Sequence, residues 1–233
     1  MPYIGFSRPT PEQVAAEHAV YNARYHTLEP QWSFTLSVIL DGSVDEVATK
    51  LGRFDGFETA MRLNPVCFEY KELARDWVVL PQGQTLSDAR VREVPGCSAN
   101  PGEDATITPG NVEGGRRYER IQFEAKDVLK AFWGLMSGVV IQRGTYVWDE
   151  DEKMGLWEVT NLDKPGMEAW LRKIIRFESV PEGGGVDGKG ERTRVVEICE
   201  GYTWERLHLF EWLAERYTKD LHSNWMSKYR GAL

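Results

Sequence analysis

The chain lacks the cluster of basic residues that a nucleic-acid-binding surface requires. It carries 28 lysines and arginines against 36 aspartates and glutamates, a net charge of -8. Phosphate binding depends on grouped positive charge, so we expect no nucleic-acid partner. No apolar stretch approaches the roughly 18 residues that a membrane span requires, so we expect no membrane-spanning segment. The start, MPYIGFSRPTPEQ, has neither the basic nor the apolar region of a signal peptide, and we expect a cytoplasmic protein.

Cysteine is scarce and metal-binding motifs are missing. Cys67, Cys97 and Cys199 are odd in number and widely spaced, which excludes a disulfide framework and a paired-cysteine zinc site. No histidine pair has the spacing of a zinc motif. Residues 183–189 match part of a phosphate-binding loop, but Gly190 stands where serine or threonine is needed. The sequence therefore predicts neither a metal nor a cofactor.

The sequence nevertheless predicts regular secondary structure near the beginning of the chain. Residues 32–40, WSFTLSVIL, alternate between apolar and polar side chains, which predicts a half-buried strand. Ser43 and Glu46 have the spacing of a helix capping box, and a second short helix is expected within residues 57–62. A further helix is predicted at residues 11–26, in an N-terminal extension of residues 1–30.

The rest of the chain reads as an antiparallel meander closed by one helix. Residues 203–229 contain neither glycine nor proline and place apolar residues at helical spacing, which predicts a long amphipathic helix. Residues 81–117 form a long Gly- and Pro-rich insert, either a lid or a disordered loop. We expect a single domain over residues 1–233. The expected strands cover residues 66–73, 118–125, 139–148, 156–160, 171–180 and 194–199.

This order of elements resembles the helix-grip fold of the SRPBCC superfamily, which includes START lipid-transfer domains and polyketide cyclase/dehydrases. The likeness is carried by FTLSVILDGSVDEVATKLGRFDGFETAMRLNP, by RTRVVEICEGYTW and by the closing helix from about Glu205. The resemblance implies an α+β fold in which a curved antiparallel sheet wraps around the long C-terminal helix, with two short helices after the first strand and an extra N-terminal helix. It also implies a cavity for apolar molecules.

Arg143 is a candidate catalytic residue because it interrupts an otherwise apolar strand. If its strand face lines a cavity, its guanidinium could bind a carboxylate or polarise a carbonyl oxygen. Alternatively, Arg143 lies outside and pairs across strands with a glutamate such as Glu158. Tyr146 and Glu158 are further candidates, as a hydrogen-bond donor and a base.

His222 is a candidate general base or acid on the closing helix. It lies four residues after Thr218, three before Trp225 and seven before Tyr229, so these residues share one flank of the helix. A histidine beside a ligand cavity suits proton transfer near neutral pH. The alternative is a surface or boundary histidine with its hydrogen bonds satisfied.

Large aromatic side chains are the expected walls of a ligand pocket, although core packing explains most of them equally well. The candidate substrate-binding residues are Phe132, Trp133, Trp148, Trp157, Trp170, Trp225 and Tyr229.

The favoured hypothesis is a cofactor-independent enzyme, similar to polyketide cyclases, acting on a hydrophobic or polycyclic small molecule. It would promote cyclisation, isomerisation or dehydration by acid/base catalysis. A non-catalytic carrier of a lipid, sterol or similar ligand is the alternative, and a START-like interaction module is a third. A homodimer stays open.

Overall fold

The structure of the chain is a computed structural model, which describes residues 30–92, 94, 96, 110–112, 115–131, 136–161, 169–181, 191–203, 208–231 and 233. The predicted helix at 11–26 lies outside these residues, as do Phe132 and Trp133. No described helix combines the length and apolar character needed to cross a bilayer.

The described strands form one antiparallel sheet with the order β1-β8-β7-β6-β5-β4-β2, and β3 pairs with β4 beside this path. From β4 to β8, each strand pairs with the next strand in the chain. The first strand, β1, pairs with the last, β8, and β2 pairs with β4 at the other edge of the sheet. The strands are β1 (Trp32–Asp41), β2 (Cys67–Pro81), β3 (Gly110–Val112), β4 (Gly115–Ala131), β5 (Met136–Asp149), β6 (Met154–Asn161), β7 (Ala169–Ser179) and β8 (Arg192–Thr203).

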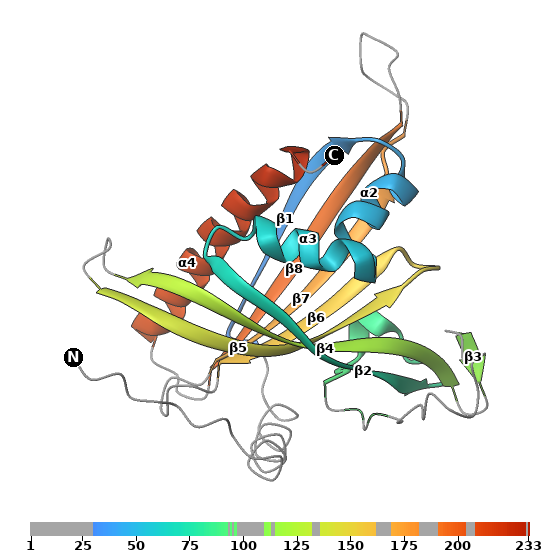
Figure 1. Cartoon of the computed structure of the whole chain (residues 1–233), viewed down its shortest axis with the longest axis horizontal. Coiled ribbons are helices and arrows are strands. Elements are labelled where there is room, and N and C mark those ends of the chain that lie inside the picture. Colours follow the sequence, from blue (N-terminus) through green and yellow to red (C-terminus); the bar gives the residue numbers. More distant parts are fainter. Residues whose placement is uncertain are drawn as a thin grey trace.

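The early local predictions are confirmed. The alternating segment is strand β1, and helix α2 (Val44–Leu51) begins with the capping box, in which Ser43 and Glu46 bond to each other's backbone N–H groups. The second short helix is α3 (Phe54–Leu63), which is longer than predicted at both ends. The tight β1–α2 connection places both short helices directly over the sheet (Figure 1).

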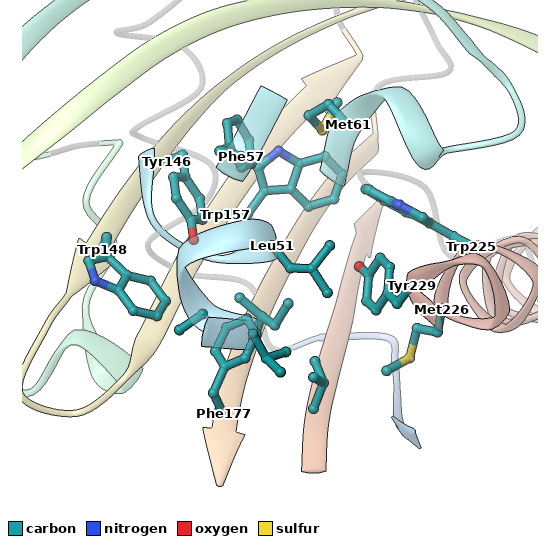
Figure 2. Close-up of a cluster of buried hydrophobic side chains, with 14 of the residues drawn as sticks. Leu51, Phe57, Met61, Tyr146, Trp148, Trp157, Phe177, Trp225, Met226 and Tyr229 are labelled. Atoms are coloured by element: carbon teal, nitrogen blue, oxygen red, sulfur yellow. The ribbon is translucent and has the colours of Figure 1, made fainter. Parts of the chain in front are cut away.

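One face of the sheet, which we call the helix face, packs against α2, α3 and the C-terminal helix α4 (His208–Ser227) (Figure 1). Figure 2 shows apolar side chains from strands and helices meeting in its core. Burying this apolar surface is the main stabilising contribution to the fold. Strand residues of the core include Phe123, Tyr146, Trp157, Val159 and Phe177, and helix residues include Leu51, Phe57, Met61, Trp225 and Met226.

The other side of the sheet, the strap face, is covered by residues 86–92, which begin with the short 3-10 helix η1 (Leu86–Asp88). Leu86, Ala89 and Val91 are buried there against Val147 and Leu156. Arginines of the sheet hold this segment by its backbone, since Arg120 donates to the carbonyl of Val91 and Arg172 donates to those of Ser87 and Ala89. Part of the predicted 81–117 insert is therefore a packed cover.

The predicted helix-grip fold is wrong. The described part of the chain is mainly an antiparallel sheet with three α-helices, and α4 runs beside the edge strand β1 instead of being wrapped by the sheet (Figure 1). The physical reason is that α2 and α3 already occupy much of the helix face with buried apolar side chains. Helix α4 is also shorter than the predicted 203–229 and is followed by the 3-10 helix η3 (Lys228–Gly231).

A buried carboxylate at one end of the sheet makes the stability of the fold depend on pH. Asp127 on β4 is 2% exposed, and its Oδ1 has no hydrogen-bond partner among the described residues. Burial raises the pKa of Asp127 to about 6, against an opposing hydrogen bond from Cys67. Since the folded-state pKa exceeds the ordinary 3.8, the stability that this carboxyl contributes is complete below 3.8 and is lost as the pH rises through 6.

We therefore expect Asp127→Asn to raise the free energy of unfolding by about 1–2 kcal/mol at roughly pH 7.5, with the gain disappearing near roughly pH 4. Urea unfolding at the two pH values measures this difference. Asp149 is the control, because it is equally buried but accepts hydrogen bonds from Arg116 and Tyr118. Asp149→Asn should destabilise the protein at neutral pH, and a destabilising Asp127→Asn there would contradict this account.

Candidate functional site

A cluster of ionisable side chains is buried on the helix face where β7, β8, α4 and η3 meet. Lys173 comes from β7, and Glu197 and Cys199 come from β8, while His222 lies on α4 and Tyr229 on η3. Alternation along β8 turns Glu197 and Cys199 to the same face as Val195, which belongs to the core. The sheet thus positions one half of the cluster, and the C-terminal helices position the other.

Glu197 is the centre of this cluster. Its Oε2 lies 2.9 Å from His222 Nδ1, and its Oε1 accepts the Tyr229 hydroxyl at 2.7 Å and the Lys173 ammonium at 3.3 Å. The side chain of Glu197 is 0% exposed and that of His222 is 2% exposed. Both carboxylate oxygens are therefore satisfied inside the protein, as a buried charge requires.

Aromatic rings surround the charged groups. The Lys173 ammonium lies 4.0 Å from the ring centroid of Trp225 and 4.8 Å from that of Trp157, distances at which a cation is attracted to an indole face. The His222 ring lies 5.3 Å from Trp225 and 6.2 Å from Phe34 between centroids. Figure 2 shows Trp157, Trp225 and Tyr229 around this part of the core.

The electrostatics of the cluster keep the carboxylate charged and the imidazole neutral. Burial alone would raise the pKa of Glu197, but Lys173, His222 and Tyr229 together lower it to about 2. Burial lowers the pKa of His222 below its ordinary value of 6.5, although Glu197 opposes this shift. The charge of Glu197 is thus balanced mainly by Lys173, and His222 is a neutral base at pH 7.

A neutral His222 must donate from Nδ1, because Glu197 offers only acceptor atoms. Its Nε2 then carries the lone pair that can take a proton. Carboxylates that hold a histidine in this tautomer occur in hydrolytic triads, where they orient the imidazole and stabilise its protonated form. The dyad of Glu197 and His222 has this arrangement, and Lys173 adds a positive charge that can stabilise a developing anion.

Glu197, Cys199 and His222 also offer three donor atoms within 4.8 Å of one another, which is compact enough for a transition metal. However, the ammonium of Lys173 already contacts the carboxylate, and a metal ion would place a second positive charge beside it. Burial also raises the pKa of the Cys199 thiol well above its ordinary value, which disfavours the thiolate that metals bind. The arrangement is therefore better suited to proton transfer.

Two predicted catalytic residues lie away from this cluster, on the strap face. Arg143 Nε lies 3.2 Å from Oε2 of Glu124, its cross-strand neighbour on β4. The cross-strand ion pair considered from the sequence is present, with Glu124 in place of Glu158. Glu158 is fully buried and accepts the backbone N–H of Arg92 at 2.8 Å. The sheet therefore separates Arg143 and Glu158 from His222.

The other predicted site residues are divided between the two faces. The rings of Trp157 and Trp225 lie 6.4 Å and 5.3 Å from that of His222 between centroids, and Tyr229 donates to Glu197, the partner of His222. Tyr146 is on the helix face, and its hydroxyl donates to the Gly52 carbonyl. Trp148 packs on Phe177 and donates to Glu150, while Trp170 follows the opposite alternation and is buried on the strap face.

Sequence reasoning missed Lys173 and Glu197, the two charges at the centre of the cluster. Both lie in largely apolar strands: Lys173 stands between Arg172 and Ile174, and Glu197 stands between Val196 and Ile198. A charged residue in such a position is the same signal that drew attention to Arg143. Applied to every strand, it would have found both residues, but not their partner on α4.

Comparisons with known proteins assign no family to the chain. No family model matches it, and no curated protein matches it either. Among solved structures, it is similar to the crystal structure of TTHA0849 from Thermus thermophilus, with a TM-score of 0.49 and 9% identity. The similarity covers 86% of this chain and 96% of the other. A likeness of this size assigns neither a family nor a function.

The charge arrangement predicts opposite pKa changes for two substitutions. Lys173→Met should raise the pKa of His222, because Glu197 would then be left with His222 as its charge partner. Glu197→Gln should lower the pKa of His222 further, because it removes the negative charge that favours the imidazolium. An NMR titration of the histidine rings, with His222→Gln to assign the signal, measures both changes. Shifts of the same sign would contradict the arrangement.

Proposed function

We propose that this protein is an acid/base enzyme for a hydrophobic small molecule, with the dyad of His222 and Glu197 as its catalytic base. The reaction class is cofactor-independent cyclisation, isomerisation or dehydration. The observation that carries the proposal is the 2.9 Å contact of His222 Nδ1 with a fully buried carboxylate. A buried imidazole held in one tautomer beside a compensating ammonium is organised for proton transfer at neutral pH.

The dyad would begin the reaction by removing a proton from a carbon next to a carbonyl group. His222 Nε2 takes the proton, and Glu197 stabilises the resulting imidazolium through Nδ1. The electron pair moves to the carbonyl oxygen, and the nearby Lys173 charge stabilises the enolate. Returning the proton at another carbon gives isomerisation. If the enolate expels a hydroxyl group, that group takes the proton from His222 and leaves as water, which is dehydration. If the enolate carbon attacks a second carbonyl group, the oxygen of that group takes the proton, which is cyclisation.

The proposed chemistry takes place on the helix face, whereas Arg143 and Glu158 lie on the strap face and take no part in it. Successive strand residues point to opposite faces of a sheet, so one small substrate cannot contact His222 and Glu158 together. Tyr146 lies on the correct face, but its hydroxyl is committed to the Gly52 carbonyl, and burial raises its pKa far above the ordinary value. Tyr229 supports the dyad by donating to Glu197.

Membership of the SRPBCC superfamily stays a prediction, as do a cytoplasmic location and a homodimer. What supports a hydrophobic or polycyclic substrate is the surroundings of the base, where Trp157, Trp225 and Phe34 lie around His222. Flat aromatic side chains suit flat apolar ligands. A carrier without catalysis would need the same aromatic surroundings but no base.

Nitrobenzisoxazole tests the base directly, because a base opens its ring by removing one carbon-bound proton while the nitrogen–oxygen bond breaks to give a coloured phenolate. We expect the protein to accelerate this reaction, and His222→Gln to slow it by roughly 100-fold or more. The rate should stay near its maximum down to a pH below 6.5, because the pKa of His222 is lowered.

His208→Gln is the matched control, because it makes the same change elsewhere on α4. It should retain the wild-type rate. Equal rates for wild type and His222→Gln would refute the enzyme proposal. If both proteins still bound the compound in that case, the carrier alternative would take its place.

A further inference from the structure

Two indole rings flank the Lys173 ammonium, and their N–H groups are used differently. Trp225 Nε1 donates to the Ala60 carbonyl on α3 at 2.7 Å. Trp157 Nε1 is buried and has no hydrogen-bond partner among the residues that the structure describes. Trp157 is 2% exposed, so bulk water does not satisfy this donor. Within the described part of the chain, one of the two N–H groups beside the base therefore has an acceptor, and the other has none.

An unsatisfied buried donor is costly. Leaving an N–H group without an acceptor inside a protein costs about 1–3 kcal/mol, and most buried indole N–H groups find a partner. Phenylalanine would provide a flat apolar ring at position 157 without this cost. Trp157 also lies near the dyad, since its ring centroid is 6.4 Å from that of His222. Its ring is also stacked with that of Phe123, at 6.4 Å between centroids.

We propose that Trp157 Nε1 donates a hydrogen bond to an oxygen atom of the substrate, which makes the substrate class an aromatic or polycyclic carbonyl compound. The inference rests on the proposed acid/base function. In it, Trp157 holds the oxygen while His222 faces the carbon that loses its proton, and the two groups contact one flat molecule. Trp157 is thereby a specificity-determining residue that distinguishes a ketone from a hydrocarbon of the same shape.

Acetylnaphthalene and ethylnaphthalene form a suitable pair of probes, because they share a ring system and only the first has a carbonyl oxygen. The measured quantity is the ratio of their dissociation constants, determined by calorimetry on the full chain. Trp157→Phe should reduce the preference for the ketone by roughly fivefold to tenfold, which corresponds to one lost hydrogen bond. The infrared carbonyl band of bound acetylnaphthalene should shift to higher frequency in the same variant.

Trp225→Phe is the matched control, because Trp225 flanks the same ammonium but its N–H already has an acceptor. Trp225→Phe should leave the ketone preference unchanged even if it weakens the binding of both compounds. Should Trp157→Phe fail to fold, replacing Trp157 with benzothienylalanine removes the N–H group and keeps the ring size. An unchanged ratio and carbonyl band in the Trp157 variants would overturn the inference, and so would failure of the wild type to bind either compound.

These binding measurements separate the inference from the proposed function. Binding requires no proton transfer, so His222→Gln should keep the ketone preference while losing the catalysis of ring opening. A normal ketone preference without His222-dependent catalysis would refute the enzyme and leave the substrate-oxygen contact standing. Catalysis that depends on His222, together with a ketone preference that Trp157→Phe leaves unchanged, would refute the Trp157 contact alone.

Discussion

The buried ion pair between Lys173 and Glu197 is the interaction on which the organisation of the helix face depends. Removing two charges from water costs several kcal/mol each, and the pair is tolerable only because each partner has further contacts. Glu197 accepts from His222 and Tyr229, and Lys173 lies against Trp157 and Trp225. The pair therefore fixes where α4 and η3 dock, since both helices supply groups that complete it.

The same pair explains how a histidine can be buried and still be basic. Burial favours the neutral form of His222 and lowers its pKa, whereas the carboxylate of Glu197 favours the imidazolium. The Lys173 ammonium balances the charge of the carboxylate and adds to the effect of burial, so the pKa of His222 stays below its ordinary value. Trp157 adds an N–H donor that has no acceptor among the described residues, so the base, the cation and this donor share one apolar environment.

The sheet divides the polar groups of the protein into two sets that cannot act together. On the strap face, Arg120 and Arg172 bind backbone carbonyls of residues 86–92, and both also pair with carboxylates on neighbouring strands. These contacts hold a cover segment in place, which is a structural role. On the helix face, Lys173, His222 and Tyr229 converge on the carboxylate of Glu197.

Local signals in the sequence predicted the parts of the fold that depend on neighbouring residues. The alternation in β1 and the capping box at Ser43 and Glu46 involve residues close in the chain, and both were found. The spacing of His222 and Trp225 also predicted that they share one flank of the closing helix, and their rings lie 5.3 Å apart between centroids. Helical periodicity fixes which residues share a flank, and that information is complete within the segment.

Contacts between distant segments could not be predicted in the same way. The face to which a strand residue points depends on register, and a slip of one residue reverses it, so Arg143 and Glu158 were joined to His222 although the sheet separates them. Apolar spacing in the closing helix showed that it packs on something, but not that α2 and α3 occupy the middle of the sheet. The helix-grip expectation failed for that reason.

The protonation state of His222 in the folded protein tests this account most directly. Nitrogen NMR shifts of the ring, measured near neutral pH, distinguish the two neutral tautomers from the imidazolium. A neutral ring with its proton on Nδ1 and a bare Nε2 is the predicted result. A proton on Nε2, or on both nitrogens, would contradict the assignment of His222 as a base oriented by Glu197.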